Sequence, residues 1–453
     1  MNHKYLIEGP SDYPPMLMVL LALFPAKSIP YVRIALMPFA NALIGVLVFL
    51  FTKHLFNSLP MALLAQLVHM LSPQTVIESS HMTPRTLGLL FFFLTAIGYY
   101  FFLDKTTLET VLLVSMLTVF VLFTHKFATQ ILLVVSVLFS ALYLNAAFIA
   151  SFLAAVLLAI VISRGFYLKI LRGHMAMFNF WSYDENRKNV LTHQIKDDKL
   201  TDVTAFIDVI KLLMRKSQVI SFFFANPFIL IPGFLILGHD KFIPSPDGLT
   251  AVYYLSNLVI ISVACGILTA SVNTLRTFGE GFKYIFYTIP VTAILTAYLF
   301  FRWDNNIFKI VMAGMLILLL AQILFLQYKA IVKDRSRSKN SSLNEILKYI
   351  NETEESKNMR IMTMPLGLAD AIMAFIKGKV FSTDSAISQI AYRGYAPKLT
   401  KPFNIWFKEY GITHFLLNKN YTALSDCKVE NLCEPLCENR DYVLMKVMGQ
   451  DGR

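Results

Sequence analysis

A short polar segment, Glu78-Ser-Ser-His-Met-Thr-Pro-Arg85, stands directly before the apolar run 86–103 and holds a carboxylate, an imidazole and a guanidinium. With the proline in the first turn of the following helix, these three groups would surround a helix N-terminus, which attracts anions. Ordinary snorkelling of the charges from an interfacial loop is the alternative. We predict catalytic roles for Glu78 and His81 and phosphate binding for Arg85.

A second polar segment, Thr124-His-Lys126, separates two apolar runs and is too short to reach far from a bilayer. Charges at such a place are costly unless they line a cavity or reach lipid headgroups. His125 and Lys126 are therefore predicted to bind a phosphate, with plain headgroup contact as the alternative.

A third segment, Arg276-Thr-Phe-Gly-Glu-Gly-Phe-Lys-Tyr284, combines two glycines, which permit close backbone approach, with two cations around one carboxylate. Glu280 can bridge the two cations as a structural ion pair. Alternatively, the cations can grip a phosphate, whose oxygens need fixed positive charge. We favour the second interpretation and predict phosphate-binding residues here, namely Arg276, Glu280, Lys283 and Tyr284.

In Asp12-Tyr-Pro-Pro15 a carboxylate precedes two adjacent prolines, a combination that occurs once in the chain. The prolines alone can explain the motif, because they fix the approach of the chain to the next helix. A carboxylate here can also act as a general base that takes a proton from an acceptor hydroxyl. Asp12 is therefore a third catalytic candidate.

Other chemistries lack a pattern in the sequence. His174, His193 and the neighbouring aspartates have no metal-ligand spacing. Cys427, Cys433 and Cys437 favour a single disulfide over a zinc site, because no fourth ligand is evident. The sequence contains no Walker loop, dinucleotide glycine fingerprint or serine nucleophile elbow. No cofactor is predicted, and no ligand pattern supports a divalent metal.

The composition indicates what kind of chain positions these residues. Of 453 residues, 56% are hydrophobic and 15% are charged, whereas soluble domains contain roughly 45–50% apolar and about 25% charged residues. This excludes a soluble enzyme, a disordered chain and a fibrous repeat, and it predicts a polytopic membrane protein. The net charge of +12 concentrates basic side chains in the loops, where they can meet anionic lipid, phosphate or nucleic acid.

The apolar runs predict an all-α membrane domain over residues 1–328. A helix needs about 20 apolar residues to cross roughly 30 Å of hydrocarbon, and about ten runs approach this length. Run 14–24 is too short and is predicted to be an interfacial or re-entrant helix. The polar segment 164–218 is predicted to lie on the membrane surface, with an amphipathic helix at 201–216. The predicted spans are 34–52, 59–71, 86–103, 111–123, 130–144, 147–162, 219–237, 250–270, 284–300 and 308–327.

The composition becomes polar after residue 327, and residues 329–453 are predicted to form a small soluble α/β domain. Helical and strand-like patterns alternate within it. The helical patterns are 343–350 and 403–410, and the strand-like patterns are 360–364, 413–417 and 442–447.

Alternate loops of a polytopic protein share a face, which would let the predicted site residues converge on one cavity. The positive-inside rule would place this basic face in the cytoplasm, but the largest basic segments are long enough to be translocated regardless of charge. The tail holds the Asn-x-Ser/Thr sequons at Asn340, Asn351 and Asn420 and three of the four cysteines, which favours an exterior tail. These patterns alone leave the orientation open.

With these motifs, the chain resembles the GT-C superfamily of integral membrane glycosyltransferases, which includes dolichyl-phosphate-mannose protein mannosyltransferases and the aminoarabinose transferases of lipid A. The similarity covers most of the chain. The matching segments are Tyr13-Pro-Pro-Met-Leu, Tyr31-Val-Arg-Ile-Ala-Leu, Ser79-Ser-His-Met-Thr-Pro-Arg-Thr-Leu-Gly, Thr124-His-Lys, Gly279-Glu-Gly-Phe-Lys-Tyr and Phe407-Lys-Glu-Tyr-Gly-Ile-Thr-His-Phe-Leu-Leu.

The resemblance implies transfer of a sugar from a polyprenyl-phosphate carrier to a protein, glycan or lipid acceptor. It implies a site at the exterior face of the plasma membrane, an exterior C-terminal domain, and membrane lipids but no nucleic acid as partners. In that family an acidic residue of the first external loop acts as base, and basic loop residues hold the carrier phosphate. Members begin with a transmembrane helix and an acidic motif ahead of the Tyr-Pro-Pro element, so we expect that first helix to be missing from this chain.

Two other functions compete with sugar transfer. A transporter or flippase for a lipid-linked or anionic substrate would need paired repeats, broken helices and ionisable residues near mid-membrane, whereas the predicted spans are almost free of charge. A non-catalytic membrane partner that lacks the first helix is the other alternative.

Overall fold

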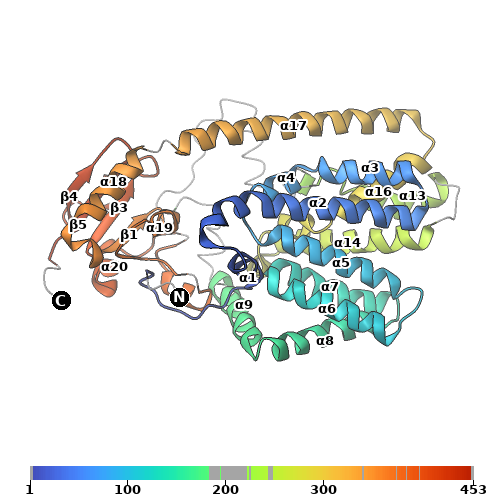
Figure 1. The fold of residues 1–453 in the computed structure, drawn as a ribbon, viewed down its shortest axis with the longest axis horizontal. Coiled ribbons are helices and arrows are strands. Elements are labelled where there is room, and N and C mark those ends of the chain that lie inside the picture. Colours follow the sequence, from blue (N-terminus) through green and yellow to red (C-terminus); the bar gives the residue numbers. More distant parts are fainter. Residues whose placement is uncertain are drawn as a thin grey trace. The chain divides into compact units, whose positions relative to one another are not determined.

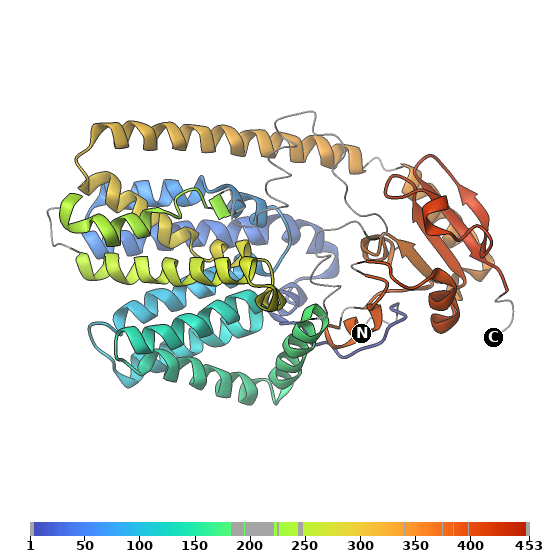
Figure 2. The same ribbon diagram turned by 180° about the vertical axis from the view of Figure 1, so that it is seen from behind.

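The fold consists of two compact units, as seen in a computed structural model that describes residues 4–182, 194, 222–223, 226–242, 248–338, 341–373, 375–383, 385–396 and 398–449. Figures 1 and 2 show the ribbon from two sides. Unit 1 comprises Met1–Tyr13, Lys169–Asp202 and Lys329–Arg453, and unit 2 comprises Pro14–Leu168 and Val203–Tyr328. Unit 1 thus joins the N-terminal segment and part of the predicted surface segment to the C-terminal domain, whereas the sequence predicted a single boundary at residue 329.

Unit 2 is built from apolar helices, most of which run side by side (Figures 1 and 2). Apolar segments form helices near a bilayer because a helix bonds every backbone N–H and C=O within itself. The helices are α1 (Met16–Ala22), α2 (Ile29–Phe56), α3 (Leu59–Met70), α4 (Pro73–Ser79), α5 (Arg85–Phe101), α6 (Leu108–Thr124), α7 (Lys126–Leu142), α8 (Ala147–Ile162), α13 (Ile231–Phe242), α14 (Leu249–Ser271), α15 (Phe282–Phe286), α16 (Ile289–Arg302) and α17 (Asn306–Ser338), of which the last extends past unit 2.

By length and composition, three helices of the described residues can cross a membrane: Ile34–Phe56, Leu249–Ser271 and Asn306–Lys329. The pair α8 and α9 (Phe166–Ser182), bent by 118°, would be a fourth if it forms one span. Five further apolar helices, α3, α5, α6, α7 and α16, have 10–17 residues. The helices agree with a membrane protein, but the number of described helices that meet this criterion, three or four, is smaller than the predicted number of about ten spans.

Helix α1 occupies the middle of the predicted interfacial run 14–24. Its Leu17 and Leu21 are buried, whereas Met18 is 70% exposed, so the helix has one packed face and one open face. Helix α9 forms the first part of the predicted surface segment. The amphipathic helix predicted at 201–216 lies outside the described residues.

Unit 1 contains a five-stranded sheet in the order β2-β1-β3-β5-β4, in which β1 pairs in parallel with β2 and β3, and β5 is antiparallel to β3 and β4. The three predicted strands correspond to β1, β3 and β5, while β2 and β4 are additional. The strands are β1 (Arg360–Met364), β2 (Lys379–Val380), β3 (His414–Asn418), β4 (Cys433–Glu438) and β5 (Tyr442–Val447), and helices α18 (Ser341–Glu352), α19 (Gly367–Met373), α20 (Phe403–Tyr410) and α21 (Leu424–Cys427) accompany them.

The N-terminal segment is part of the sheet unit. Tyr5 forms a parallel bridge with Val380, and the ammonium of Lys4 donates to the carbonyls of Met373 and Ile376 after α19, at 3.1 and 2.7 Å. These contacts extend the sheet beyond its two-residue strand β2. The start of the chain therefore completes the edge of the C-terminal domain.

Asp12 is buried in the same unit, with 2% of its surface exposed. Its carboxylate accepts hydrogen bonds from the backbone N–H groups of Ala386 and Ile387, both at 2.8 Å, and from the hydroxyl of Ser385 at 3.0 Å. An added Cβ at Gly173 of α9 would lie 2.8 Å from the carbonyl oxygen of Asp12, so α9 packs closely here. Asp12 therefore has a structural role, in which its carboxylate caps the backbone N–H groups of Ala386 and Ile387.

We expect Asp12→Ala to destabilise unit 1 by about 1.5–3 kcal/mol, because hydrogen bonds to a buried charge are lost and their donors stay buried. The readout is the temperature at which Cys427 and Cys433 react with a thiol reagent, located by mass spectrometry. Both thiols are buried in the native unit, and burial raises the pKa of Cys433 to about 12, so their reaction reports unfolding.

The matched control is Glu8→Ala, which removes an exposed N-terminal carboxylate lying 3.7 Å from Lys379. A surface ion pair of this kind contributes about 0–1 kcal/mol. Equal thermal shifts in the two variants would contradict the structural role of Asp12.

Candidate functional site

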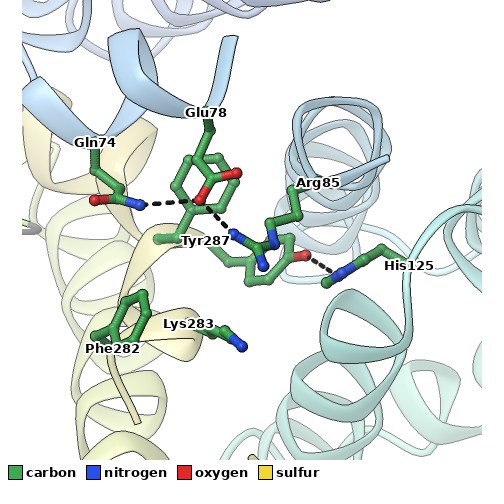
Figure 3. A pocket seen from close by; sticks show the side chains of 8 residues that line it. Gln74, Glu78, Arg85, His125, Phe282, Lys283 and Tyr287 are labelled. Atoms are coloured by element: carbon green, nitrogen blue, oxygen red, sulfur yellow. Dashed lines mark hydrogen bonds and ion pairs between the residues drawn. The ribbon is translucent and has the colours of Figure 1, made fainter. Parts of the chain in front are cut away.

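A small pocket in unit 2 collects polar residues from four separate parts of the chain (Figure 3). The space between its lining atoms measures about 210 Å³, and part of this space is open to solvent. Carboxylate, guanidinium, imidazole and ammonium groups share it with two phenylalanines. The lining residues are Gln74, Glu78, Arg85, His125, Phe282, Lys283, Phe286 and Tyr287.

The carboxylate of Glu78 is fixed on one side of the pocket. Its Oε1 lies 2.6 Å from Nη1 of Arg85 and accepts from the amide of Gln74 at 3.0 Å, and its Oε2 accepts from Thr83 at 3.4 Å. Only 7% of the Glu78 side chain is exposed, against 30% for Arg85. The carboxylate is therefore held in one orientation, while the guanidinium is partly exposed.

Local structure explains this arrangement. Helix α4 begins at Pro73, whose missing N–H is no loss in a first turn, and Gln74 and Glu78 lie four residues apart on it, which places them on one face. The chain then turns, and α5 begins at Arg85 directly after Pro84. The two short helix ends thus present the acid and the guanidinium to each other.

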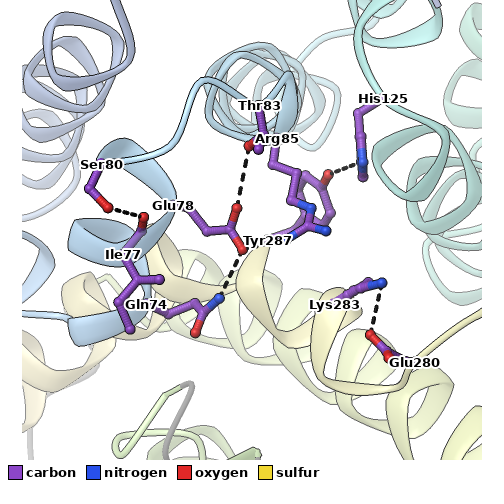
Figure 4. Close-up of polar contacts among 10 residues, drawn as sticks. All are labelled: Gln74, Ile77, Glu78, Ser80, Thr83, Arg85, His125, Glu280, Lys283 and Tyr287. Carbon is purple, nitrogen blue, oxygen red and sulfur yellow. Dashed lines mark hydrogen bonds and ion pairs between the residues drawn. The ribbon is translucent and has the colours of Figure 1, made fainter. Parts of the chain in front are cut away.

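His125 enters the pocket from the break between α6 and α7. It has an extended backbone, φ −153° and ψ 133°, between two helices, and it is 4% exposed. Its Nδ1 lies 2.8 Å from the hydroxyl oxygen of Tyr287 (Figure 4). The break between the two apolar helices therefore lets the imidazole of His125 point into the pocket.

Two ammonium groups meet beside one aromatic ring. Nζ of Lys126 and Nζ of Lys283 lie 4.9 and 5.2 Å from the ring centroid of Phe127, and Lys283 is 2.8 Å from the carboxylate of Glu280 (Figure 4). The pKa of Lys126 is lowered to about 8, mainly by burial and to a smaller extent by the cations Lys283 and Arg85, against the opposing effect of Glu280. The cluster holds more positive than negative charge.

The glycines of this segment permit its close packing. Gly279 has a φ of +115°, and an added Cβ there would lie 2.3 Å from Cε1 of Phe127. An added Cβ at Gly281 would lie 2.2 Å from the carbonyl oxygen of Gly266 in α14. The two glycines therefore hold Glu280 between α14 and the ring of Phe127.

The predicted site residues are only partly brought together. Glu78, Arg85, His125 and Lys283 line the pocket, and Lys126 and Glu280 adjoin it through Lys283 and Phe127.

Three predicted residues are placed elsewhere, and the side chain of a fourth is not described. His81 is exposed in the turn after α4 and does not line the pocket. Tyr284 is buried, and its hydroxyl donates to Gln130 at 2.8 Å and to the carbonyl of Phe278 at 3.1 Å, which is a packing role. Asp12 belongs to unit 1, and the side chain of Arg276 lies outside the described structure.

Four lining residues were not predicted from the sequence, namely Gln74, Phe282, Phe286 and Tyr287. Gln74 could have been found, because it lies one helical turn before Glu78. Tyr287 could have been found in the same way, one turn after Lys283. The two phenylalanines give no signal in a chain with 38 of them.

No group of three His, Cys, Asp or Glu residues suited to a metal ion occurs among the described residues. The four cysteines are free thiols, so the single disulfide favoured from the sequence is not formed. Cys433 and Cys437 contribute to different cores of the sheet, because the strand between them carries a bulge.

The comparisons with known proteins add no relative. No protein-family model matches the chain, and a search of curated proteins finds no match.

We expect Gly281→Ala to lower the thermal stability of unit 2 markedly, since the added methyl group would press on the backbone oxygen of Gly266 and overpacking typically costs about 1–3 kcal/mol. Thermal unfolding of the purified protein in detergent measures the change. The control is Gly233→Ala in α13, where an added Cβ meets nothing within 4 Å. A control that unfolds as early as Gly281→Ala would contradict this packing.

Anion binding at the pocket should weaken as the pH rises from 7 to 9. Lys126 stands ahead of the predicted span 130–144, and its pKa of about 8 means that its ammonium is mostly charged at pH 7 and mostly neutral at pH 9. The probe is a short-chain prenyl phosphodiester, whose own charge is constant over this range. Lys126→Arg should bind with little pH dependence, because arginine stays protonated. An unchanged pH dependence in that variant would refute the assignment.

Proposed function

We propose that the protein is a membrane glycosyltransferase that moves a sugar from a polyprenyl-phosphate carrier to an acceptor at the exterior membrane face. The observation that carries the proposal is the pocket itself, in which Arg85, Lys283 and His125 meet the buried carboxylate of Glu78 among apolar helices. Charged groups in such surroundings mark substrate sites. The resemblance to the GT-C superfamily supplies the reaction class.

The charge balance of the pocket supports a phosphodiester ligand. Among the described side chains around it, the three cations Arg85, Lys126 and Lys283 face the two carboxylates Glu78 and Glu280. The surplus of one positive charge matches the single negative charge of a sugar that is linked to a prenyl chain through one phosphate. Fixed guanidinium and ammonium groups suit phosphate oxygens.

The apolar side of the pocket suits the carrier. Phe282 and Phe286 line it next to Lys283, so a charged phosphate and a hydrocarbon chain can be accommodated by adjacent walls. A carrier that lies in the bilayer can then present its phosphate without its prenyl chain having to leave the apolar phase.

The proposed step assigns a role to each group. The acceptor hydroxyl oxygen forms a bond to C1 of the sugar while the bond from C1 to the phosphate oxygen breaks, and the phosphate keeps the electron pair. Glu78 takes the hydroxyl proton as general base. Arg85, His125, Lys126 and Lys283 hold the phosphate and stabilise the charge that develops on it.

We assign no catalytic role to Asp12, because it does not line the pocket and its carboxylate accepts hydrogen bonds from the backbone of Ala386 and Ile387. His81 was predicted to be catalytic, but it does not line the pocket, so we assign it only a flanking contact to the ligand. Arg276 keeps its predicted role in phosphate binding. Tyr284 is assigned to packing.

We also propose about ten membrane crossings. Residues 4–13, α9 beyond Lys169 and the C-terminal sheet belong to one compact unit, so the chain must return to one side of the membrane between these parts. The chain therefore crosses the membrane an even number of times between residues 14 and 168, and again between residues 203 and 328. Six predicted runs lie in the first range and four in the second, and both numbers are even. The three polar segments of the site each follow an even number of runs, which places them on one face.

We place this face outside the plasma membrane. The exposed sequon residue Asn420 belongs to unit 1, and sequons are modified on exterior or luminal domains. The lumen-facing or exterior side is also where a polyprenyl-phosphate sugar of this family is used.

The test is transfer of labelled sugar from a polyprenyl-phosphate donor by the purified protein. Glu78→Gln should lower the rate by about 10²-fold or more, the usual scale for a general base, with donor binding largely retained. Lys283→Ala should weaken donor binding. The control is Lys309→Ala, which removes an exposed ion pair with Asp304 outside the pocket.

Full activity in both Glu78→Gln and Lys283→Ala would overturn the assignment. Movement of the labelled lipid across proteoliposomes with no chemical change would instead favour a transporter or flippase. Absence of both transfer and transport would favour a non-catalytic membrane partner.

A further inference from the structure

The two oxygens of the Glu78 carboxylate have unequal surroundings (Figures 3 and 4). Oε1 lies 2.6 Å from Nη1 of Arg85 and accepts from the amide of Gln74 at 3.0 Å. The one described partner of Oε2 is the hydroxyl of Thr83, at 3.4 Å. Hydrogen bonds between hydroxyl groups and oxygen are usually 2.5–3.0 Å long, so Oε1 is held firmly and Oε2 is the less engaged oxygen.

The amide of Gln74 has one possible orientation in this contact. A carboxylate accepts hydrogen bonds and has none to donate, so the amide must turn its NH₂ group towards Glu78. Nε2 of Gln74 and Nη1 of Arg85 therefore donate to the same oxygen, one from α4 and the other from α5. Two donors from different helices prevent the carboxylate from exchanging its two oxygens by rotation.

Helix α4 gives Gln74 a fixed position. Thr75, the next residue along it, is 1% exposed. Its hydroxyl donates to the carbonyl of Ser72 at 2.7 Å and lies 3.3 Å from the carbonyl oxygen of His69, near the end of α3. The start of α4 is thereby joined to the end of α3, and the amide of Gln74 approaches Glu78 from an anchored helical turn.

We propose that Gln74 is a positioning residue for sugar transfer, which holds Oε1 of Glu78 together with Arg85 and leaves Oε2 as the atom that takes the proton. The proton of the acceptor hydroxyl passes to Oε2 while the hydroxyl oxygen forms its bond to C1 of the sugar. The bond from C1 to the phosphate oxygen breaks, and the phosphate keeps the electron pair. The role in transfer rests on the proposed function, whereas the orientation of the carboxylate does not.

The orientation can be measured without any reaction. The full-length protein, labelled with ¹³C at the side-chain carboxyl groups of glutamate, is reconstituted in phosphatidylcholine bilayers for infrared spectroscopy. The separation between the symmetric and antisymmetric carboxylate bands depends on how unequally the two oxygens are bound. Glu78→Gln identifies the bands of Glu78. Gln74→Met keeps the length of the side chain but removes the amide, and it should change this separation.

The matched control is Gln322→Met. Gln322 is exposed on α17 and does not line the pocket, so this variant should leave the Glu78 bands and the transfer rate unchanged. Because both variants carry the same substitution, a difference between them reports the bond from Gln74 to Glu78.

In the transfer assay, Gln74→Met should lower kcat about tenfold, because a hydrogen bond to a charged group is lost. The KM for the donor should stay nearly unchanged, since the amide acts through Glu78. A loss of packing would instead raise KM and lower the thermal stability.

Gln74→Glu separates the hydrogen bond from the shape of the side chain. Two carboxylates this close share a proton in acidic solution. The protonated carboxyl can donate to Oε1 as the amide does, whereas the ionised form repels Glu78. Relative to the unmodified protein at the same pH, the rate should rise about tenfold from about pH 8 to about pH 5. This ratio removes the titration of the other groups of the pocket.

Unchanged carboxylate bands in Gln74→Met would overturn the inference, whatever reaction the protein performs. Changed bands together with full transfer in Gln74→Met, or a relative rate of Gln74→Glu that is independent of pH, would overturn the role in transfer. Changed bands in a protein whose unmodified form transfers no sugar would support the orientation of Glu78 and count against the proposed function.

Discussion

The structure of the pocket follows from one constraint, which is that charge placed among apolar helices has to be held by partners. Glu78 meets this requirement through a 2.6 Å contact with Arg85 and the amide of Gln74. Removing either partner would leave an uncompensated charge beside apolar surface, which costs far more than the pair gains. The short helix α4, the turn after it and the start of α5 at Arg85 all serve to bring these groups together.

The same constraint explains the irregular backbone around the pocket. A continuous helix through Thr124 and Lys126 would direct the imidazole of His125 along an apolar face, whereas the extended residue between α6 and α7 directs it inward. The glycines beside Glu280 let their segment approach Phe127 and α14 closely enough to bring Lys283 to the same place. Apolar packing therefore positions the polar groups.

The sequence predicts the chemistry of the site better than its assembly. Alternate loops of a membrane protein share a face, and on that basis Arg85, His125 and Lys283 were expected to converge, together with His81, which does not line the pocket. Asp12 was predicted as a catalytic residue from its carboxylate, and nothing local in the sequence reveals that this carboxylate accepts hydrogen bonds from Ala386 and Ile387. The strand β2 was also missed, since a two-residue strand gains its partners only from the fold.

The bridge between Tyr5 and Val380 has a consequence for biosynthesis. The ribosome makes Tyr5 long before Val380, because the helices of unit 2 lie between them in the sequence. Contacts this distant in sequence form slowly, because the loop between them must close against chain entropy. Residues 4–13 therefore have no sheet partner while the helices between them and β2 are being made, and their binding to the sheet edge is a late step of folding.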